Sequence, residues 1–219
     1  MTVAVISANL GAYDRETLWP ALDAPAGVAV RVHRFTDATC APRPLAMTAR
    51  LRCGLPKWFG PEFVPGADVY VWIDASCTPT PGAVAWFLEQ LGPNDAAFFR
   101  HPDRATVREE YDFIVARMAR RGETYLTSRY RGEWLTEQFA AIESAGHADA
   151  RLFASTAFIY RPTPPVLALL KEVWYGKTRY HLHDQLWLAH AVAAGRARVG
   201  VIDADYLKCP AFSFTRQRR

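Results

Sequence analysis

The stretch Val69-Tyr70-Val71-Trp72-Ile73-Asp74-Ala75-Ser76 decides the fold that we expect for this chain. Its first five residues are all apolar and are β-branched or aromatic, a composition typical of a strand buried on both faces of a sheet. The run ends on the carboxylate of Asp74. Because ligands of open α/β sheets bind just outside the carboxyl ends of the strands, Asp74 is a candidate for holding a divalent cation, a ribose hydroxyl or a proton. The alternative interpretation is an Asp that caps the helix that follows.

Length and composition describe one ordinary globular domain. The chain has 219 residues, of which 50% are hydrophobic and 22% are charged, so it can bury a substantial core. We therefore expect residues 1–219 to form a single domain. The net charge of +4 is spread along the chain and fits either a phosphorylated small molecule or a solvated surface. No nucleic-acid motif is present, so no nucleic-acid partner is expected.

The cysteines and the apolar segments indicate the compartment. The chain's 4 cysteines form no C-x-x-C pair, which argues against a zinc ribbon or a disulfide framework and fits a reducing compartment. Residues 3–6 are apolar without the features of a signal peptide, and no apolar window is long enough to cross a bilayer. We expect a cytoplasmic protein without a transmembrane segment.

Strands and helices are expected to alternate along the chain. Apolar patterning predicts strands at 2–7, 28–35, 69–73, 96–99, 152–160 and 198–202, and helices at 48–53, 81–91, 107–118, 133–145, 164–174 and 186–194. Thr80 is expected to cap the second of these helices. Alternating elements, several strands that end in acids and extra helices in the second half predict a mixed α/β domain.

Small residues and acids follow the first two strands. Ala8-Asn9-Leu10-Gly11 would let a ligand approach the backbone closely, but it is not a G-x-G-x-x-G dinucleotide fingerprint. The second strand also ends at an acid, Asp37. Arg50, Arg52 and Lys57 precede the central strand, where they would either reach a phosphate at its end or lie in an ordinary basic surface loop.

The group His181-Leu182-His183-Asp184-Gln185 opens a helix and combines imidazole with carboxylate. One carboxylate, one imidazole and phosphate oxygens would suit manganese, although Asp184 is also a candidate helix cap. In the helix at 107–118, Thr106 and Glu109 match a capping box, which leaves Glu110 available for chemistry. No G-x-S-x-G, Walker A or H-E-x-x-H motif is present, and nothing singles out an activated serine.

An ordered set of short motifs resembles a known family. The set consists of Gly11-Ala12-Tyr13-Asp14, Phe35-Thr36-Asp37, Trp72-Ile73-Asp74-Ala75-Ser76, His101-Pro102-x-Arg104 with Glu109-Glu110, and Asp184-Gln185-Leu186. It resembles the glycosyltransferase-like family, once a domain of unknown function, that includes plant proteins of seed-coat mucilage synthesis. More distantly it resembles the retaining sugar-nucleotide transferases. The resemblance covers residues 3–188. It implies a single GT-A-like (Rossmann-like) α/β domain, with a central mixed, mostly parallel sheet flanked by helices.

The resemblance also implies residues that bind the nucleotide and its diphosphate. Ala8, Asn9, Tyr13 and Asp37 would lie near the base and ribose. The D-x-D motif of such enzymes, which binds the metal and the donor diphosphate, is matched by Asp74-Ala75-Ser76, so its second acid is missing. A manganese or magnesium ion would then have Asp74, Ser76 and His183 as its expected protein ligands.

The remaining residues would serve the transfer itself. His101, Arg104 and Glu110 would border the acceptor or the diphosphate, and Arg50, Lys57 and Arg104 would offset the diphosphate charge. Asp184 and Gln185 would face the transferred sugar. For an inverting reaction either Glu110 or Asp184 would be the general base, and retention and inversion both stay open.

The expected function is transfer of a sugar from a nucleotide-sugar donor to a carbohydrate or glycoconjugate acceptor, in cell-surface polysaccharide synthesis. Two alternatives remain. A nucleotidyltransferase would use strand-end acids to hold two metal ions, but the sequence lacks the paired acids. A non-catalytic module that binds a nucleotide sugar or a carbohydrate would explain the missing second acid.

Overall fold

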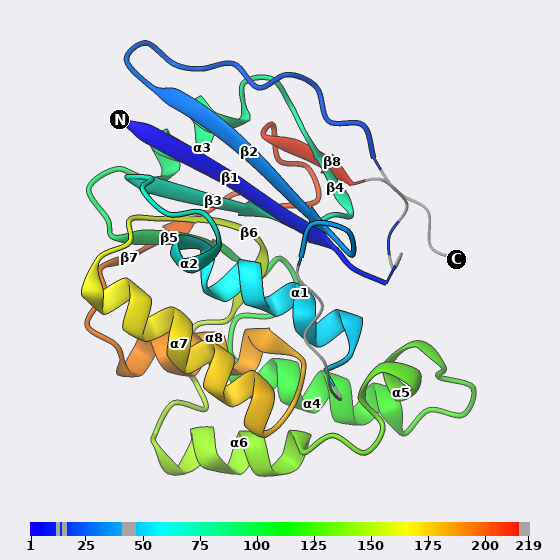
Figure 1. The fold of residues 1–219 in the computed structure, drawn as a ribbon. Coiled ribbons are helices and arrows are strands. Elements are labelled where there is room, and N and C mark those ends of the chain that lie inside the picture. The colour runs from blue at the N-terminus through cyan, green and yellow to red at the C-terminus, as the bar shows by residue number, and fades with distance from the viewer. Residues whose placement is uncertain (12–13, 15–16, 41–46, 215–219) are drawn as a thin grey trace.

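The computed structural model describes residues 1–11, 14, 17–40 and 47–214 and is built around a six-stranded sheet. The strand order is β2-β1-β3-β6-β5-β7 (Figure 1). The bounds are β1 Thr2–Asn9, β2 Ala29–Thr36, β3 Val69–Ile73, β5 Ala96–Arg100, β6 Phe153–Tyr160 and β7 Val199–Ile202. β1 runs parallel to β2 and β3, and β5 runs parallel to β7, whereas β6 is antiparallel to both of its neighbours. The predicted mixed, mostly parallel sheet is confirmed.

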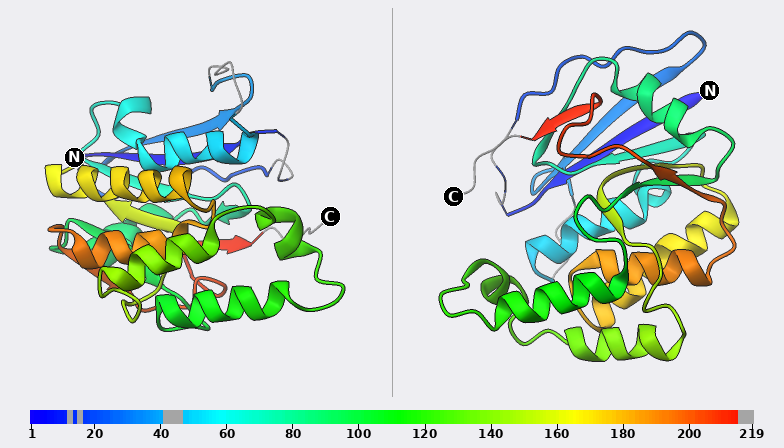
Figure 2. Two further views of the ribbon diagram at one scale, coloured as in Figure 1. Left: turned by 90° about the horizontal axis from the view of Figure 1, so that it is seen from below. Right: turned by 180° about the vertical axis from the view of Figure 1, so that it is seen from behind.

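Helices cover both faces of this sheet (Figures 1 and 2). On one face lie α1 (Ala49–Trp58), α4 (Val107–Met118), α6 (Leu135–Ser144), α7 (Pro164–Arg179) and α8 (Asp184–Ala194). On the other face lie α3 (Ala83–Leu91) and a two-stranded ribbon of β4 (Cys77–Pro79) and β8 (Phe212–Phe214). Two short helices, α2 (Gly60–Phe63) and α5 (Tyr125–Tyr130), complete the described elements. No helix in the described ranges is long and apolar enough to span a membrane.

The apolar run of β3 is explained by these two covered faces. Tyr70 and Trp72 point into the core beneath α1, α7 and α8, and Val71 and Ile73 point into the core beneath α3. All five residues of the strand are buried. Since side chains alternate between the faces of a strand, a strand covered on both sides needs apolar residues at every position.

Several expected helix boundaries are wrong. The helix expected at 48–53 continues to Trp58 and contains Pro56. The prolines of this region therefore do not reliably indicate a loop. The helix expected to end at 174 continues to Arg179, and α8 begins at Asp184 rather than at residue 186. The short elements β4, β8 and α5 were not expected, because segments of three to six residues carry too little periodicity.

Thr80 does not cap α3, as the sequence led us to expect. The N-cap residue of α3 is Gly82, which makes no side-chain capping bond. The Thr80 hydroxyl instead donates to the backbone carbonyl of Pro210, 2.9 Å away. Tertiary contact with the segment before β8 therefore replaces the local cap.

Candidate active site

Asp74 follows β3 at the edge of the sheet where β1, β2 and β3 all end. Its backbone N–H donates to the carbonyl of Thr156 in β6 (2.8 Å), so the first half of antiparallel β6 shares this edge. Its side-chain Oδ1 accepts a hydrogen bond from Trp72 Nε1–H (2.7 Å), and 35% of the side chain is exposed. Because α3 begins only at Ala83, the interpretation of Asp74 as a helix cap is wrong.

Asp184 is the first residue of α8, and its carboxylate is satisfied from other elements. The Ser155 hydroxyl donates to Oδ1 (2.9 Å), while Lys57 Nζ and Lys177 Nζ lie 3.2 and 3.7 Å from Oδ2. His183 occupies the N-cap position without a side-chain capping bond. The alternative in which Asp184 caps its own helix is therefore wrong.

Lys57 joins the two carboxylates. Its Nζ lies 3.5 Å from Asp74 Oδ1, in addition to its contact with Asp184, and donates to Ser155 Oγ at 3.2 Å. Five elements thus meet at one point: the ends of α1, α7 and β3, the start of α8 and the early part of β6. We refer to Lys57, Asp74, Ser155, Lys177 and Asp184 as the lysine–aspartate cluster.

The charges of this cluster stabilise one another against burial. Burial disfavours the ionised Asp184 carboxylate, but Lys57 and then Lys177 outweigh it and hold the pKa of Asp184 well below its usual range. Burial likewise disfavours the Lys57 ammonium, yet Asp184 and Asp74 raise its pKa. At Lys177 burial prevails and lowers the pKa. Asp184 is therefore ionised and Lys57 protonated at neutral pH.

A second group of polar side chains lies against the start of α8. Glu110 of α4, whose side chain is 4% exposed, forms an ion pair with Arg104 and lies with Oε1 3.2 Å from His183 Nε2. His101 Nδ1 accepts the backbone N–H groups of Asp103 and Arg104 (3.3 and 3.1 Å). Burial would raise the pKa of Glu110, but His183 and Arg104 lower it. We refer to His101, Arg104, Glu110 and His183 as the glutamate–histidine cluster.

Glu109 has the structural role predicted for it. Its backbone N–H donates to Thr106 Oγ (3.2 Å), and its carboxylate accepts the N–H of Ala105 (2.7 Å). The N-terminus of α4 is therefore capped from its own sequence. The neighbouring Glu110 points inward instead.

Three of the residues expected near a nucleotide lie at the ends of β1 and β2. Asp37 accepts the backbone N–H of Gly11 (2.7 Å), and its side chain is 54% exposed. Asn9 exchanges hydrogen bonds with the backbone of Asp14 (2.8 and 3.2 Å), and Ala8 is buried at the end of β1. Tyr13, the fourth, lies outside the described residues.

Each of the expected metal ligands has another partner. His183 Nε2 faces Glu110, Asp74 Oδ1 faces Lys57, and the Ser76 hydroxyl lies 4.0 Å from Cys77 Sγ. Among the described residues, no group of three His, Cys, Asp or Glu side chains is arranged to hold a metal ion. The residues present do not fit the expected manganese or magnesium site, which stays a prediction.

Two more predicted residues are not members of either cluster. Arg50 stacks over the ring of Tyr130, with its guanidinium carbon 4.9 Å from the ring centroid. Gln185 follows Asp184 in the first turn of α8 and is partly buried. Lys177 was missed from the sequence because the helix that carries it was expected to end at Trp174.

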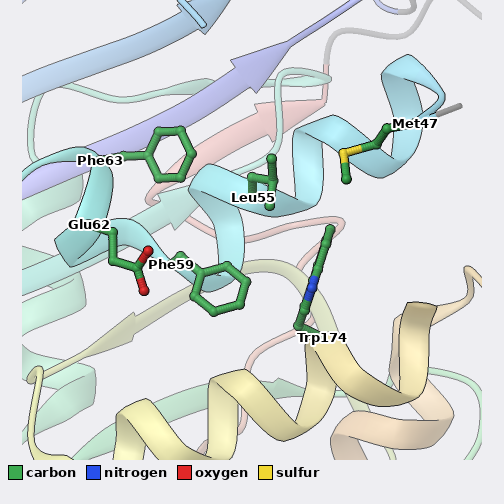
Figure 3. Close-up of a pocket in the computed structure, with 6 residues that line it drawn as sticks. All are labelled: Met47, Leu55, Phe59, Glu62, Phe63 and Trp174. Atoms are coloured by element: carbon green, nitrogen blue, oxygen red, sulfur yellow. The ribbon is translucent and has the colours of Figure 1, made fainter. Parts of the chain in front are cut away.

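Pockets open on the described surface near these elements. One of about 290 Å³ lies between α1, α2 and α7 and is mostly apolar (Figure 3). It is lined by Met47, Leu55, Phe59, Glu62, Phe63 and Trp174, none of which belongs to either cluster. Another, of about 490 Å³, includes His101 and Arg104, so it adjoins the glutamate–histidine cluster.

Comparison with known proteins identifies the fold. No protein-family model and no curated protein matches the chain. A glycosyltransferase involved in glycosylation of the major capsid of PBCV-1 has a TM-score of 0.51 and 11% identity, over 98% of this chain and 93% of that one. The bifunctional glycosyltransferase WbbM has a TM-score of 0.51 and 12% identity, over 92% of this chain and 38% of that one. Mouse xyloside xylosyltransferase 1 has a TM-score of 0.50 and 9% identity, over 93% of this chain and 86% of that one.

This chain has the fold of these glycosyltransferases. The predicted fold class is thereby confirmed, while the narrower likeness to the mucilage-synthesis family stays a prediction. At identities of 9 to 12% the likeness is one of fold, and a function has to be argued from the site.

Proposed function

We propose that this protein is a glycosyltransferase that moves a sugar from a nucleotide-sugar donor to a carbohydrate or glycoconjugate acceptor. One observation carries the proposal. Asp74 and Asp184 converge on Lys57 at the sheet edge where ligands of α/β folds bind, in a chain with a glycosyltransferase fold. The two acids are far apart in the sequence, so their convergence is a product of the fold.

The reaction makes specific demands on such a site. An oxygen of the acceptor hydroxyl forms a bond to the anomeric carbon of the donor sugar, and its proton passes to a base. The bond between that carbon and the diphosphate breaks, and the nucleoside diphosphate leaves with the electron pair. Negative charge grows on the leaving oxygen and positive charge grows on the sugar, so fixed charges of both signs favour the transition state.

The lysine–aspartate cluster offers both signs at one point. In our proposal Lys57 lies toward the leaving diphosphate, and Asp74 and Asp184 lie toward the donor sugar. Because its pKa is lowered, Asp184 is a weak proton acceptor and is better suited to stabilising positive charge on the sugar. The pKa of Glu110 is lowered as well, so Glu110 is also a weak proton acceptor.

The ends of β1 and β2 would hold the nucleotide. Gly11 has a φ of +69°, and a Cβ there would lie 2.6 Å from the Cβ of Ala49, so the loop after β1 passes closely over α1. In the proposal Ala8, Asn9 and Asp37 meet the base and ribose at this edge. A role in cell-surface polysaccharide synthesis and a cytoplasmic location belong to the same proposal and rest on sequence resemblance and cysteine usage.

A thermal-shift panel of nucleotides and nucleotide sugars tests this function. We expect one nucleotide family to stabilise the protein, by about 2.7 kcal/mol when the ligand is at 100 times its Kd. If neither nucleotides nor nucleotide sugars stabilise the protein, the proposal is wrong. Stabilisation without turnover, with plausible acceptors present, would favour the non-catalytic binding module that Ser76 in the place of a second acid suggests.

The variant Asp74→Asn sharpens the same experiment. Asn keeps the side-chain oxygen that accepts Trp72 Nε1–H but loses the charge beside Lys57. We expect turnover to be lost while the melting temperature stays near that of the wild type. Asp68→Asn is the matched control, because Asp68 precedes the same strand at the opposite edge and its carboxylate accepts the Thr2 backbone N–H (2.6 Å).

A further inference from the structure

Two lysines are buried at the point where the two acids converge. Lys57 and Lys177 are each 8% exposed, and lysine is almost never buried without a charged partner. They come from different helices, α1 and α7, and both approach the same oxygen, Oδ2 of Asp184, at 3.2 and 3.7 Å. The fold has therefore placed two ammonium groups beside each other, in contact with one carboxylate.

The cluster has the charge balance of a metal site without needing a metal ion. Two ammonium groups carry the charge of one divalent cation, and Asp74 and Asp184 carry the compensating negative charge. Lys57 Nζ already lies within 3.5 Å of both carboxylates. A cation placed between these acids would come close to the Lys57 ammonium and be repelled by it.

The other expected ligands offer no second place for an ion. Magnesium takes oxygen ligands at about 2.0–2.1 Å in near-ideal octahedral geometry and is commonly bound by one or two carboxylates together with water and substrate phosphates, and neither of the other expected ligands is a carboxylate. Ser76 contributes one neutral hydroxyl, and His183 is turned toward Glu110. The missing second acid of the D-x-D motif removes a metal ligand, and the two buried lysines add positive charge at the same site. The two observations therefore agree.

We propose that Lys57 and Lys177 supply the positive charge that a divalent cation would otherwise supply to the donor diphosphate, so that donor binding and transfer need no metal. This inference rests on the proposed glycosyltransferase function. Asp184 and Ser155 hold Lys57 in place from the interior, and Asp74 holds it from the solvent side. The cluster meets solvent at Asp74, whose side chain is 35% exposed while those of both lysines are below 10%, so in the proposal the donor enters on this side with its sugar toward Asp74 and its diphosphate toward Lys57.

Arg50 adds to the positive charge on this side of the sheet. Its positive charge is one of the causes, after burial, that lower the pKa of Lys177. An anion bound beside Lys177 would relieve this repulsion and favour the ammonium form. Diphosphate binding and the charge on Lys177 should therefore reinforce each other.

The test measures nucleotide binding rather than activity alone. UDP, GDP and their sugars are titrated calorimetrically into the wild-type protein in EDTA, in Mg²⁺ and in Mn²⁺. We expect the Kd of the nucleotide that binds to agree within about twofold in the three buffers, because the cations that meet the diphosphate belong to the chain. Binding that requires Mg²⁺ or Mn²⁺, or that tightens about tenfold or more with either ion, would overturn the inference and leave the proposed function standing.

Variants of one helix provide the second arm. Lys177→Met removes a buried cation, and Lys171→Met removes an exposed one from the same helix. We expect Lys177→Met to weaken nucleotide binding in EDTA about tenfold or more and Lys171→Met to leave it unchanged. Equal binding by the wild type and a folded Lys177→Met would overturn the role of Lys177. If that variant does not fold, the comparison of buffers on the wild type decides. Absence of nucleotide binding in every buffer would refute the proposed function and this inference with it.

Discussion

Asp184 is the residue on which the lysine–aspartate cluster depends most. Its two oxygens face a hydroxyl and two ammonium groups, while Asp74 shares only one of those ammonium groups. Removing one partner of a buried ion pair leaves an uncompensated charge in a low-dielectric interior, which costs more than the pair itself contributes. The residue is therefore structural as well as a candidate for the site.

The change Asp184→Asn should lower the free energy of unfolding by about 3 kcal/mol, because two buried ammonium groups lose their shared carboxylate. Urea unfolding measures the loss. Asp37→Asn is the control, since Asp37 is largely exposed and its pairing with Arg52 at 3.6 Å is weak; it should cost less than about 1 kcal/mol. Similar small losses in both variants would show that the cluster does not stabilise the fold.

His181 should make the protein sensitive to mild acid. Burial is the main cause that lowers its pKa from 6.5 to about 3, and His183 and Arg50 add to the shift. Its Nδ1 accepts the backbone N–H of His183 (3.0 Å), a bond that protonation would break, and Glu133 Oε2 lies 3.6 Å from Nε2. Below pH 6.5 the unfolded chain therefore binds a proton that the folded chain does not bind, and the free energy of unfolding falls as the pH falls.

The expected slope from His181 is roughly 1.4 kcal/mol per pH unit between pH 6.5 and the folded pKa. Between pH 6.5 and 5.0 the wild type should lose about 2 kcal/mol more than His181→Asn, which keeps an acceptor but does not titrate. Urea unfolding at the two pH values gives the difference. Equal losses in the two proteins would mean that His181 is protonated in the folded state.

At the scale of elements, the packing of α7 against α8 assembles the cluster. Trp187 of α8 lies directly over Gly176 of α7, where a Cβ would come within 2.0 Å of its indole. The indole is fixed by a hydrogen bond from Nε1–H to Glu172 (3.0 Å). Lys177 is the next residue after this glycine, so the close approach of the helices brings its ammonium to Asp184.

In the variant Gly176→Ala, helix propensity and packing have opposite effects on stability. Propensity alone predicts a gain of about 1 kcal/mol, whereas the overlap with Trp187 should cost about 1–3 kcal/mol or more. We expect net destabilisation in urea unfolding. The double variant Gly176→Ala/Trp187→Leu should cost less than the sum of its single changes, because the smaller side chain relieves the overlap. A Gly176→Ala variant that is more stable than the wild type would contradict this packing.

The sequence predicted the elements that local patterning determines. The apolar run of β3 and the acid at its end follow from a strand covered on both faces, and the capping box of α4 follows from spacing alone. The partners of these acids do not follow from local patterning. Lys177 reaches Asp184 only because Gly176 admits Trp187, and no sequence periodicity records such a contact.

Local patterning also explains why two acids were weighed as helix caps and why His183 was expected to bind a metal ion. Asp74 and Asp184 were both weighed as caps because caps are local, yet each carboxylate is used by elements distant in sequence. His183 was assigned to a metal by its neighbours in the chain, but Glu110 of α4 takes its Nε2. Residue types and order gave the candidate site residues; only the fold shows which of them meet.

At the scale of the whole molecule, a mixed sheet with one antiparallel strand creates the site. Parallel β1, β2 and β3 end at one edge, and antiparallel β6 brings Ser155 and Thr156 to the same edge. In the proposed function the ends of β1 and β2 would hold the nucleotide, and the lysine–aspartate cluster would meet its diphosphate. The glutamate–histidine cluster, beside a pocket of about 490 Å³, would border the acceptor.

The central claim is that this edge catalyses sugar transfer. The most direct measurement incubates the protein with a panel of nucleotide sugars and carbohydrate acceptors and detects nucleoside diphosphate and glycosylated product by mass spectrometry. We expect equal amounts of both products from one donor, with product formation lost in Asp74→Asn and kept in Asp68→Asn. Product formation that survives in Asp74→Asn would contradict the site, and a panel in which no donor is bound or consumed would contradict the function.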